Sequence, residues 1–73
     1  MTPVGDEDRH HGVVDSFEAE RGIGVVSDGG GTWSFHCTAI ADGTRTIEAG
    51  VEVSFEVRPG HLGRWEAAAL RRR

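Results

Sequence analysis

Apolar and polar residues alternate without a break across residues 51–57 (VEVSFEV), the most regular pattern in the chain. Because successive side chains of a strand point to opposite faces, this segment is predicted to be a strand with one buried face and one face in water. Residues 32–37 (TWSFHC) alternate in the same way. There, Trp33 and Phe35 are expected to enter the core, and the residues between and after them to point outward.

Two further segments are rich in β-branched residues, 12–17 (GVVDSF) and 22–27 (GIGVVS), and a short polar stretch joins them. Segments of this kind favour an antiparallel pair of strands. The glycines at positions 29–31 can reach the positive φ angles that tight hairpin connections need. They predict a turn from the second strand to the third.

Residues 38–50 (TAIADGTRTIEAG) lack strand periodicity and are predicted to form a connection with a short helical turn. Ile40 and Ile47 are expected to anchor this connection to the core. Residues 64–70 (RWEAAAL) have a local propensity for helix, yet they close a series of short strands. Five short strands with one long connection before the fourth suggest a small all-β barrel, in which the exposed strand edges find partners.

Size and composition indicate one small folded domain. The chain has 73 residues, of which 37% are hydrophobic and 27% charged, and it is therefore too apolar for a wholly disordered protein. Folding at this size removes only about 60% of the unfolded surface from water, so no large cavity or buried cofactor is expected. Residues 1–11 are predicted to be a disordered leader, residues 12–70 the barrel, and residues 71–73 a basic tail.

The net charge of −4 argues against a polyanionic partner, but the charges are unevenly placed. Acidic residues crowd positions 6–8, whereas Arg64 and the arginines at 71–73 crowd the end. Terminal runs of this kind are mostly solvated tails and less often electrostatic arms. Cys37 is the only cysteine, and no stretch is long and apolar enough for a signal sequence or a membrane span. We expect a soluble, cytoplasmic protein with no membrane partner.

An ordered series of short motifs between residues 12 and 70 resembles the cold-shock domain family. The matching residues are Gly12-Val13-Val14, Phe17, Arg21-Gly22-Ile23-Gly24, Phe35-His36-Cys37-Thr38-Ala39-Ile40, Gly50, Val53-Ser54-Phe55-Glu56, Gly60, Gly63 and Ala67. The resemblance implies a small five-stranded antiparallel barrel of the oligonucleotide-binding type, with residues 64–70 as its last strand. It also implies binding of single-stranded RNA or DNA, whose bases stack on exposed aromatic rings for about 1–3 kcal/mol each.

The sequence departs from the family at most of these ring positions. Phe17 and His36 remain in place, and Asp15 replaces a lysine that the family has on its first strand. The residues that replace family aromatics are Ser16, Ile23, Val25, Ser34, Cys37 and, in the long connection, Thr44. Binding is therefore expected to be weak and salt-sensitive, or altered in its preference.

Eight residues are candidate contacts to nucleic acid, and one of them, Trp65, has no usual aromatic counterpart in the family. Those expected at bases are Phe17, Ile23, Val25, His36 and Trp65, and those expected at phosphates are Arg21, Arg45 and Arg64. Each type of residue also has an ordinary structural role. Phe17 can cover the barrel end, Trp65 can pack on the leader, and the arginines can act as solubilising charges. Exposed aliphatic residues also suit a protein partner or a second copy of the chain, so a protein-interaction module is the alternative function.

Other chemistries fit the sequence poorly. The segment Gly22-Ile23-Gly24 does not continue to a glycine at position 27, so it is no dinucleotide fingerprint. The four histidines and Cys37 show neither CxxC nor HxxxH spacing, so no metal is expected. No nucleophile has a base beside it in the sequence. We expect neither an enzyme nor a cofactor.

Overall fold

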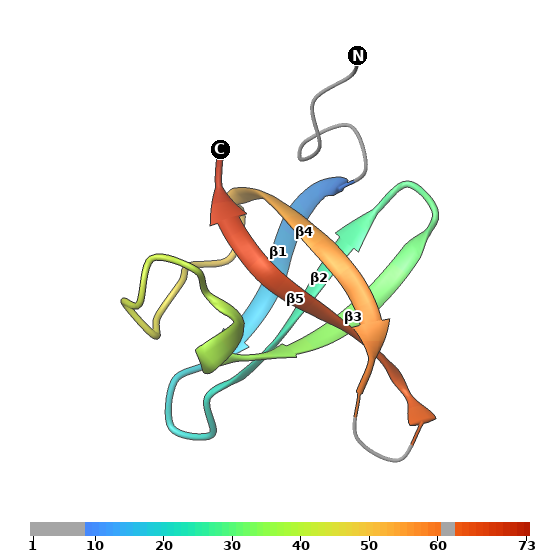
Figure 1. Cartoon of the computed structure of the whole chain (residues 1–73). Helices are drawn as coiled ribbons and strands as arrows, with labels where there is room; N and C mark the ends of the chain where they lie inside the picture. Colours follow the sequence, from blue (N-terminus) through green and yellow to red (C-terminus); the bar gives the residue numbers. More distant parts are fainter. Residues whose placement is uncertain (1–8, 61–62) are drawn as a thin grey trace.

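The computed structural model describes residues 9–60 and 63–73, which form a five-stranded barrel (Figure 1). The strands are β1 (His10–Glu18), β2 (Ile23–Asp28), β3 (Gly31–His36), β4 (Glu52–Pro59) and β5 (Trp65–Arg72). Their order around the closed barrel is β1-β2-β3-β5-β4, and β4 pairs with β1. All neighbours are antiparallel except β3 and β5, which meet in parallel at Ser34 and Glu66. The predicted barrel is confirmed, and residues 65–70 belong to a strand despite their helix propensity.

The core fills the barrel with aliphatic side chains around two phenylalanine rings. Phe35 and Phe55 are both 0% exposed. The other buried apolar residues are Val14, Val26, Ile40, Ile47, Val53, Ala67 and Leu70. Trp33 is partly buried and packs against this cluster, which confirms the predicted phase of the third strand.

Gly24 allows β2 to run close to the core and to β1. A Cβ at this position would lie 2.5 Å from Cζ of Phe35 and 2.7 Å from the main-chain oxygen of Ser16. Real Cβ atoms do not approach other atoms so closely, so any larger residue would push the Phe35 ring or the β1 backbone away. The glycine is therefore required by packing at a position between two outward-facing residues.

The connection between β3 and β4 begins with a short 3-10 helix, η2 (Cys37–Ala39). This confirms the predicted helical turn. Ile40 and Ile47 are buried, as expected of its anchors. Arg72 holds the loop by pairing with Asp42 and by donating a hydrogen bond of 2.6 Å to the main-chain oxygen of Thr46. In the part of the chain that the structure describes, no helix is long and apolar enough to cross a membrane.

The first and last strands extend beyond residues 12–70, the range predicted for the barrel. His10 and His11 pair with Phe55 and Ser54 of β4, so the first strand begins inside the predicted leader. Arg71 pairs with Ser54, so most of the predicted basic tail is strand. Ladder hydrogen bonds use main-chain groups, which polar residues supply as well as apolar ones. Residues 1–8 of the predicted leader lie outside the described residues.

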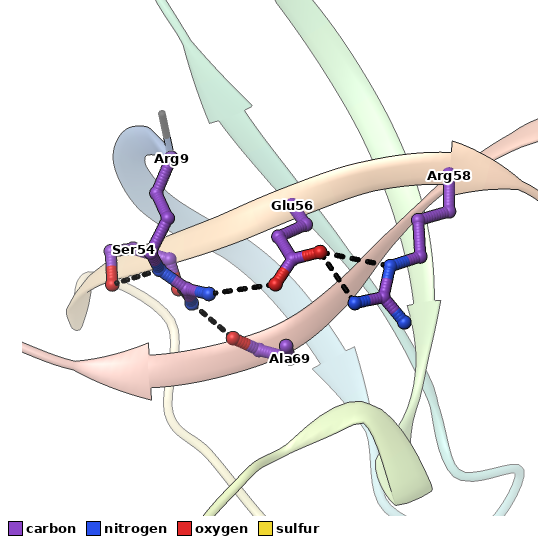
Figure 2. Close-up of polar contacts among 5 residues, drawn as sticks. All are labelled: Arg9, Ser54, Glu56, Arg58 and Ala69. Carbon is purple, nitrogen blue, oxygen red and sulfur yellow. Dashed lines mark hydrogen bonds and ion pairs between the residues drawn. The ribbon is translucent and has the colours of Figure 1, made fainter. Parts of the chain in front are cut away.

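The outer face of β4 is less exposed than its alternating pattern predicted. Ser54 is only 5% exposed, because the side chain of Arg9 crosses it (Figure 2). Arg9 donates from Nε to the Ser54 hydroxyl at 3.1 Å and from Nη2 to the Ser54 main-chain oxygen at 2.9 Å. Val57 is also only partly buried. The predicted strand is confirmed, but its two faces are not cleanly dry and wet.

Arg9 also reaches β5, where the pairing with β4 is irregular. The register shifts between Ser54 and Glu56, and Ala69 in the irregular segment has a positive φ of 51°. The guanidinium donates a further hydrogen bond to the main-chain oxygen of Ala69 and forms an ion pair with Glu56 at 3.3 Å. The Arg9 side chain is 4% exposed. It therefore joins β4 to β5 where the ladder itself is interrupted.

Candidate functional site

The outward side of β1, β2 and β3 carries two rows of directly opposed residues. We call the six residues of these rows the platform. The first row is Ser16, Val25 and Ser34, and the second is Glu18, Ile23 and His36. Ile23 and Val25 are partly buried at the centre, and the four outer residues are exposed. The platform is an aliphatic strip with polar margins, and His36 carries its only ring.

A β-bulge in β1 decides which β1 side chains reach the platform. The register with β2 shifts between Val14 and Ser16, and one extra residue in a strand changes the face to which later side chains point. Phe17 therefore pairs with Gly24 on the inner side of the sheet. Its ring stacks on Phe35 with centroids 5.9 Å apart. Phe17 covers the barrel end and is not part of the platform.

The margins of the platform carry more carboxylates than cations. Glu18 is paired with Arg21 at 3.4 Å, and both side chains are exposed. Asp15 accepts a hydrogen bond of 2.8 Å from the hydroxyl of Ser27. Glu66, the β5 neighbour of Ser34, extends the first row on the other side. Arg21 is thus beside the platform at the end of β1, and a carboxylate already contacts it.

The other three predicted contact residues lie off the platform. Arg45 is exposed in the β3–β4 connection, with a positive φ of 62°. Arg64 is exposed just before β5. Trp65 is 60% exposed and pairs with Pro59 in the β4–β5 hairpin. Because its neighbour Glu66 is the partner of Ser34, Trp65 points to the opposite face of the sheet.

An open cleft of about 420 Å³ lies next to His36, between η2 and the β4–β5 hairpin. His36, Arg58 and Glu66 bring ionisable groups to it. Arg58 donates a 2.9 Å hydrogen bond from Nε to Glu56, and this bond is the main reason that the pKa of the Glu56 carboxyl is lowered. Arg58 and Glu66 were not predicted from the sequence, because they come from strands far from His36 along the chain.

Metal ligands are not gathered in the described part of the chain. No group of three or more His, Cys, Asp or Glu side chains among residues 9–60 and 63–73 is placed to hold an ion. His10 is engaged elsewhere, because its Nδ1 lies 2.9 Å from Oδ2 of Asp28 and its ring stacks on Phe55. His61 lies outside the described residues.

Comparison with known proteins supports the resemblance seen in the motifs. The chain is 44% identical over 54 residues to the cold shock-like protein CspD of Bacillus cereus, a match that covers 71% of this chain and 82% of that protein. The chain belongs to the cold shock protein family. It is also 44% identical over 54 residues to the cold shock protein CspB of Bacillus caldolyticus, with the same coverage. The cold shock protein CspD of Bacillus subtilis (strain 168) is 44% identical over 55 residues, which are 73% of this chain and 83% of that protein. No family model matches the chain.

Four of the six positions at which the family resemblance implies a replaced aromatic ring lie together on the platform, whereas Cys37 lies in η2 and Thr44 in the β3–β4 connection. Ser16, Val25 and Ser34 form one complete row of the platform, and Ile23 lies at the centre of the other. Neighbouring strands lie about 4.8 Å apart, so a row of three residues spans roughly 10 Å. These four positions therefore form one continuous surface of small and aliphatic side chains.

Proposed function

We propose that this cold shock protein binds single-stranded RNA or DNA through the platform, weakly or with an altered preference. The observation that supports this is the contiguity of the platform: the substituted positions share one outward face of a barrel that keeps the family's fold. An aliphatic floor offers apolar contact to a base, but it lacks the ring geometry that makes stacking favourable. A nucleic-acid strand that lies over the platform therefore still finds a docking surface, but it loses most of the stacking energy.

We propose different roles for the predicted contact residues. Ile23 and Val25 lie under the bases, and His36 supplies the remaining ring at the end of the second row. Phe17 supports the platform from beneath through Phe35. Trp65 offers a stacking ring only to a nucleic-acid strand that continues past β5.

Phosphate contacts are assigned to Arg21, Arg45 and Arg64, whose side chains are exposed. Binding that depends on a few arginine–phosphate contacts weakens steeply with salt, because each contact releases counterions. We therefore expect oligonucleotide binding by the parent protein to be salt-sensitive.

A protein-interaction module is the second candidate. Ile23 and Val25 form an apolar centre with a polar margin, and Asp15, Glu18 and Glu66 around it repel phosphate. Such a surface suits a protein partner or a second copy of the chain. In this case the barrel is retained and nucleic-acid binding is lost.

Refilling the platform with rings distinguishes the two functions. The variant carries Ile23→Phe, Val25→Phe and Ser34→Phe. A separate control protein carries Ala49→Phe, at an exposed residue of the connection, and measures non-specific binding by an added exposed ring. With roughly 1–3 kcal/mol per restored base contact and incomplete additivity, the triple variant should bind a short pyrimidine-rich strand at least about tenfold more tightly than the parent. The measurement is fluorescence anisotropy of a labelled oligonucleotide at two salt concentrations.

Two results would contradict the proposal. If neither the parent nor the folded triple variant binds the oligonucleotide, nucleic-acid binding is refuted and the protein-interaction module is the better account. If the parent binds tightly at high salt, the expected weakness is wrong, and Trp65→Ala then tests whether that ring has taken over the stacking.

A further inference from the structure

A basic cleft lies away from the platform, where the end of β5 meets β4 and the start of β1. It has a volume of about 410 Å³ and is lined by His11, Ser54, Arg71, Arg72 and Arg73. None of these five residues is acidic. The margins of the platform, by contrast, carry Asp15, Glu18 and Glu66. Three of the eight arginines of the chain therefore lie on a different part of the barrel from the platform.

Two arginine heads are available in the basic cleft. Arg71 and Arg73 are exposed, and neither forms an ion pair with another described residue. Arg72 is turned away, because its guanidinium is bound to Asp42 and to the main-chain oxygen of Thr46. A phosphate entering the cleft would meet two guanidinium groups, which bind phosphate oxygens in a planar, two-pronged geometry.

The outward residues of β1 connect the platform to the basic cleft. Ser16 belongs to the platform, Val13 is 38% exposed and pairs with Ser27, and His11 lines the cleft. A second cleft, of about 390 Å³, adjoins the first. Val13, Ser27, His11 and Arg73 line it together with the carboxylates of Asp28 and Glu52, so a phosphate path along β1 must stay on the side of His11 and Arg73. At about 3.3 Å per strand residue, Ser16 and His11 are roughly 16 Å apart along β1. A flexible single strand of nucleic acid can therefore contact both the platform and the basic cleft.

We propose that the basic cleft holds backbone phosphates of the same single strand whose bases lie on the platform. This inference rests on the proposed function and extends it: the platform contacts bases, while Arg71 and Arg73 supply an electrostatic anchor at the other end of β1. It accounts for binding by an acidic protein whose platform margins are themselves acidic. The main share of salt sensitivity is then expected from β5 and not from Arg21.

The test compares the double variant Arg71→Gln, Arg73→Gln with a control of equal net charge, Ala41→Glu, Ala49→Glu, whose two sites are exposed in the connection. Each lost phosphate contact reduces the salt dependence of single-strand binding by about 0.7 on a log–log scale, so the double variant should lose about 1.4. Between about 50 and 200 mM salt, the parent and the control should therefore lose about sevenfold more affinity for a labelled thymidine oligonucleotide than the double variant does.

A second measurement needs no substitution. Titration of the parent with the same oligonucleotide, followed by amide NMR shifts, should move the signals of His11, Arg71 and Arg73 as well as those of the platform. If the oligonucleotide binds but the salt slope and the cleft signals do not change, this inference is overturned and the proposed function stands. If the parent binds no oligonucleotide, the proposed function fails and this inference fails with it.

Discussion

Replacing Arg9 by methionine should destabilise the barrel far more than its position near one end of the chain suggests. The side chain is 4% exposed and donates hydrogen bonds to the Ser54 hydroxyl and to the main-chain oxygens of Ser54 and Ala69. Methionine keeps much of the apolar stem of arginine but has no donor. The substitution therefore tests the hydrogen bonds of Arg9 and largely preserves its packing.

The magnitude follows from the acceptors left behind. A buried polar group without its partner costs about 1–3 kcal/mol, and Ser54 is only 5% exposed. With partial compensation by water, Arg9→Met should cost about 2–4 kcal/mol of unfolding free energy. For a domain of this size that corresponds to a drop in melting temperature of roughly 10–30 °C. Such a loss is a large fraction of the total stability of a small domain, which is about 5–15 kcal/mol.

The assay is urea unfolding followed by the fluorescence of the tryptophans, with a thermal melt by circular dichroism. Arg58→Met is the matched control, because Arg58 contacts the same Glu56 carboxylate but is well exposed; its melting temperature should stay within a few degrees of the parent's. If the melting temperature of Arg9→Met also stays within a few degrees of the parent's, the hydrogen bonds to Ser54 and Ala69 do not stabilise the barrel.

Two further predictions concern the packing of the core and the loss of stability at low pH. Phe55 is 0% exposed, so Phe55→Ala should cost about 3–5 kcal/mol in urea unfolding, and a melting temperature near the parent's would show that Phe55 is not a core residue. The pKa of Asp28 is lowered below its usual 3.8, mainly by a hydrogen bond from His10 and, to a smaller extent, by one from the Gly30 amide. The stability that results is present above the pKa of Asp28 in the unfolded state, and it is lost as the pH falls through the pKa of Asp28 in the folded state. Asp28→Asn should therefore lower the melting temperature at neutral pH and flatten its decline below about pH 4, and an unchanged slope of melting temperature against pH would contradict this.

Local pattern in the sequence was enough to predict the strands and most of the core. The alternation over residues 51–57 lies almost entirely within β4, and the phase of Trp33 and Phe35 placed both rings correctly. Ile40 and Ile47 were found as isolated apolar residues in a polar connection. These features succeed because burial of apolar side chains follows the two-residue period of a strand, which can be read within a few neighbouring positions.

Tertiary structure decided what depends on contacts between distant segments. The bulge in β1 turned Phe17 inward, a change of face that the residue types around it do not predict. The sequence around Arg9 shows no alternation of apolar and polar residues. Arg9 is buried because its hydrogen-bond acceptors lie on β4 and β5, at least 45 residues away. Arg71 and His11 meet only because Ser54 pairs with both. Barrel closure sets these juxtapositions through main-chain pairing, which leaves little trace in the identity of the side chains.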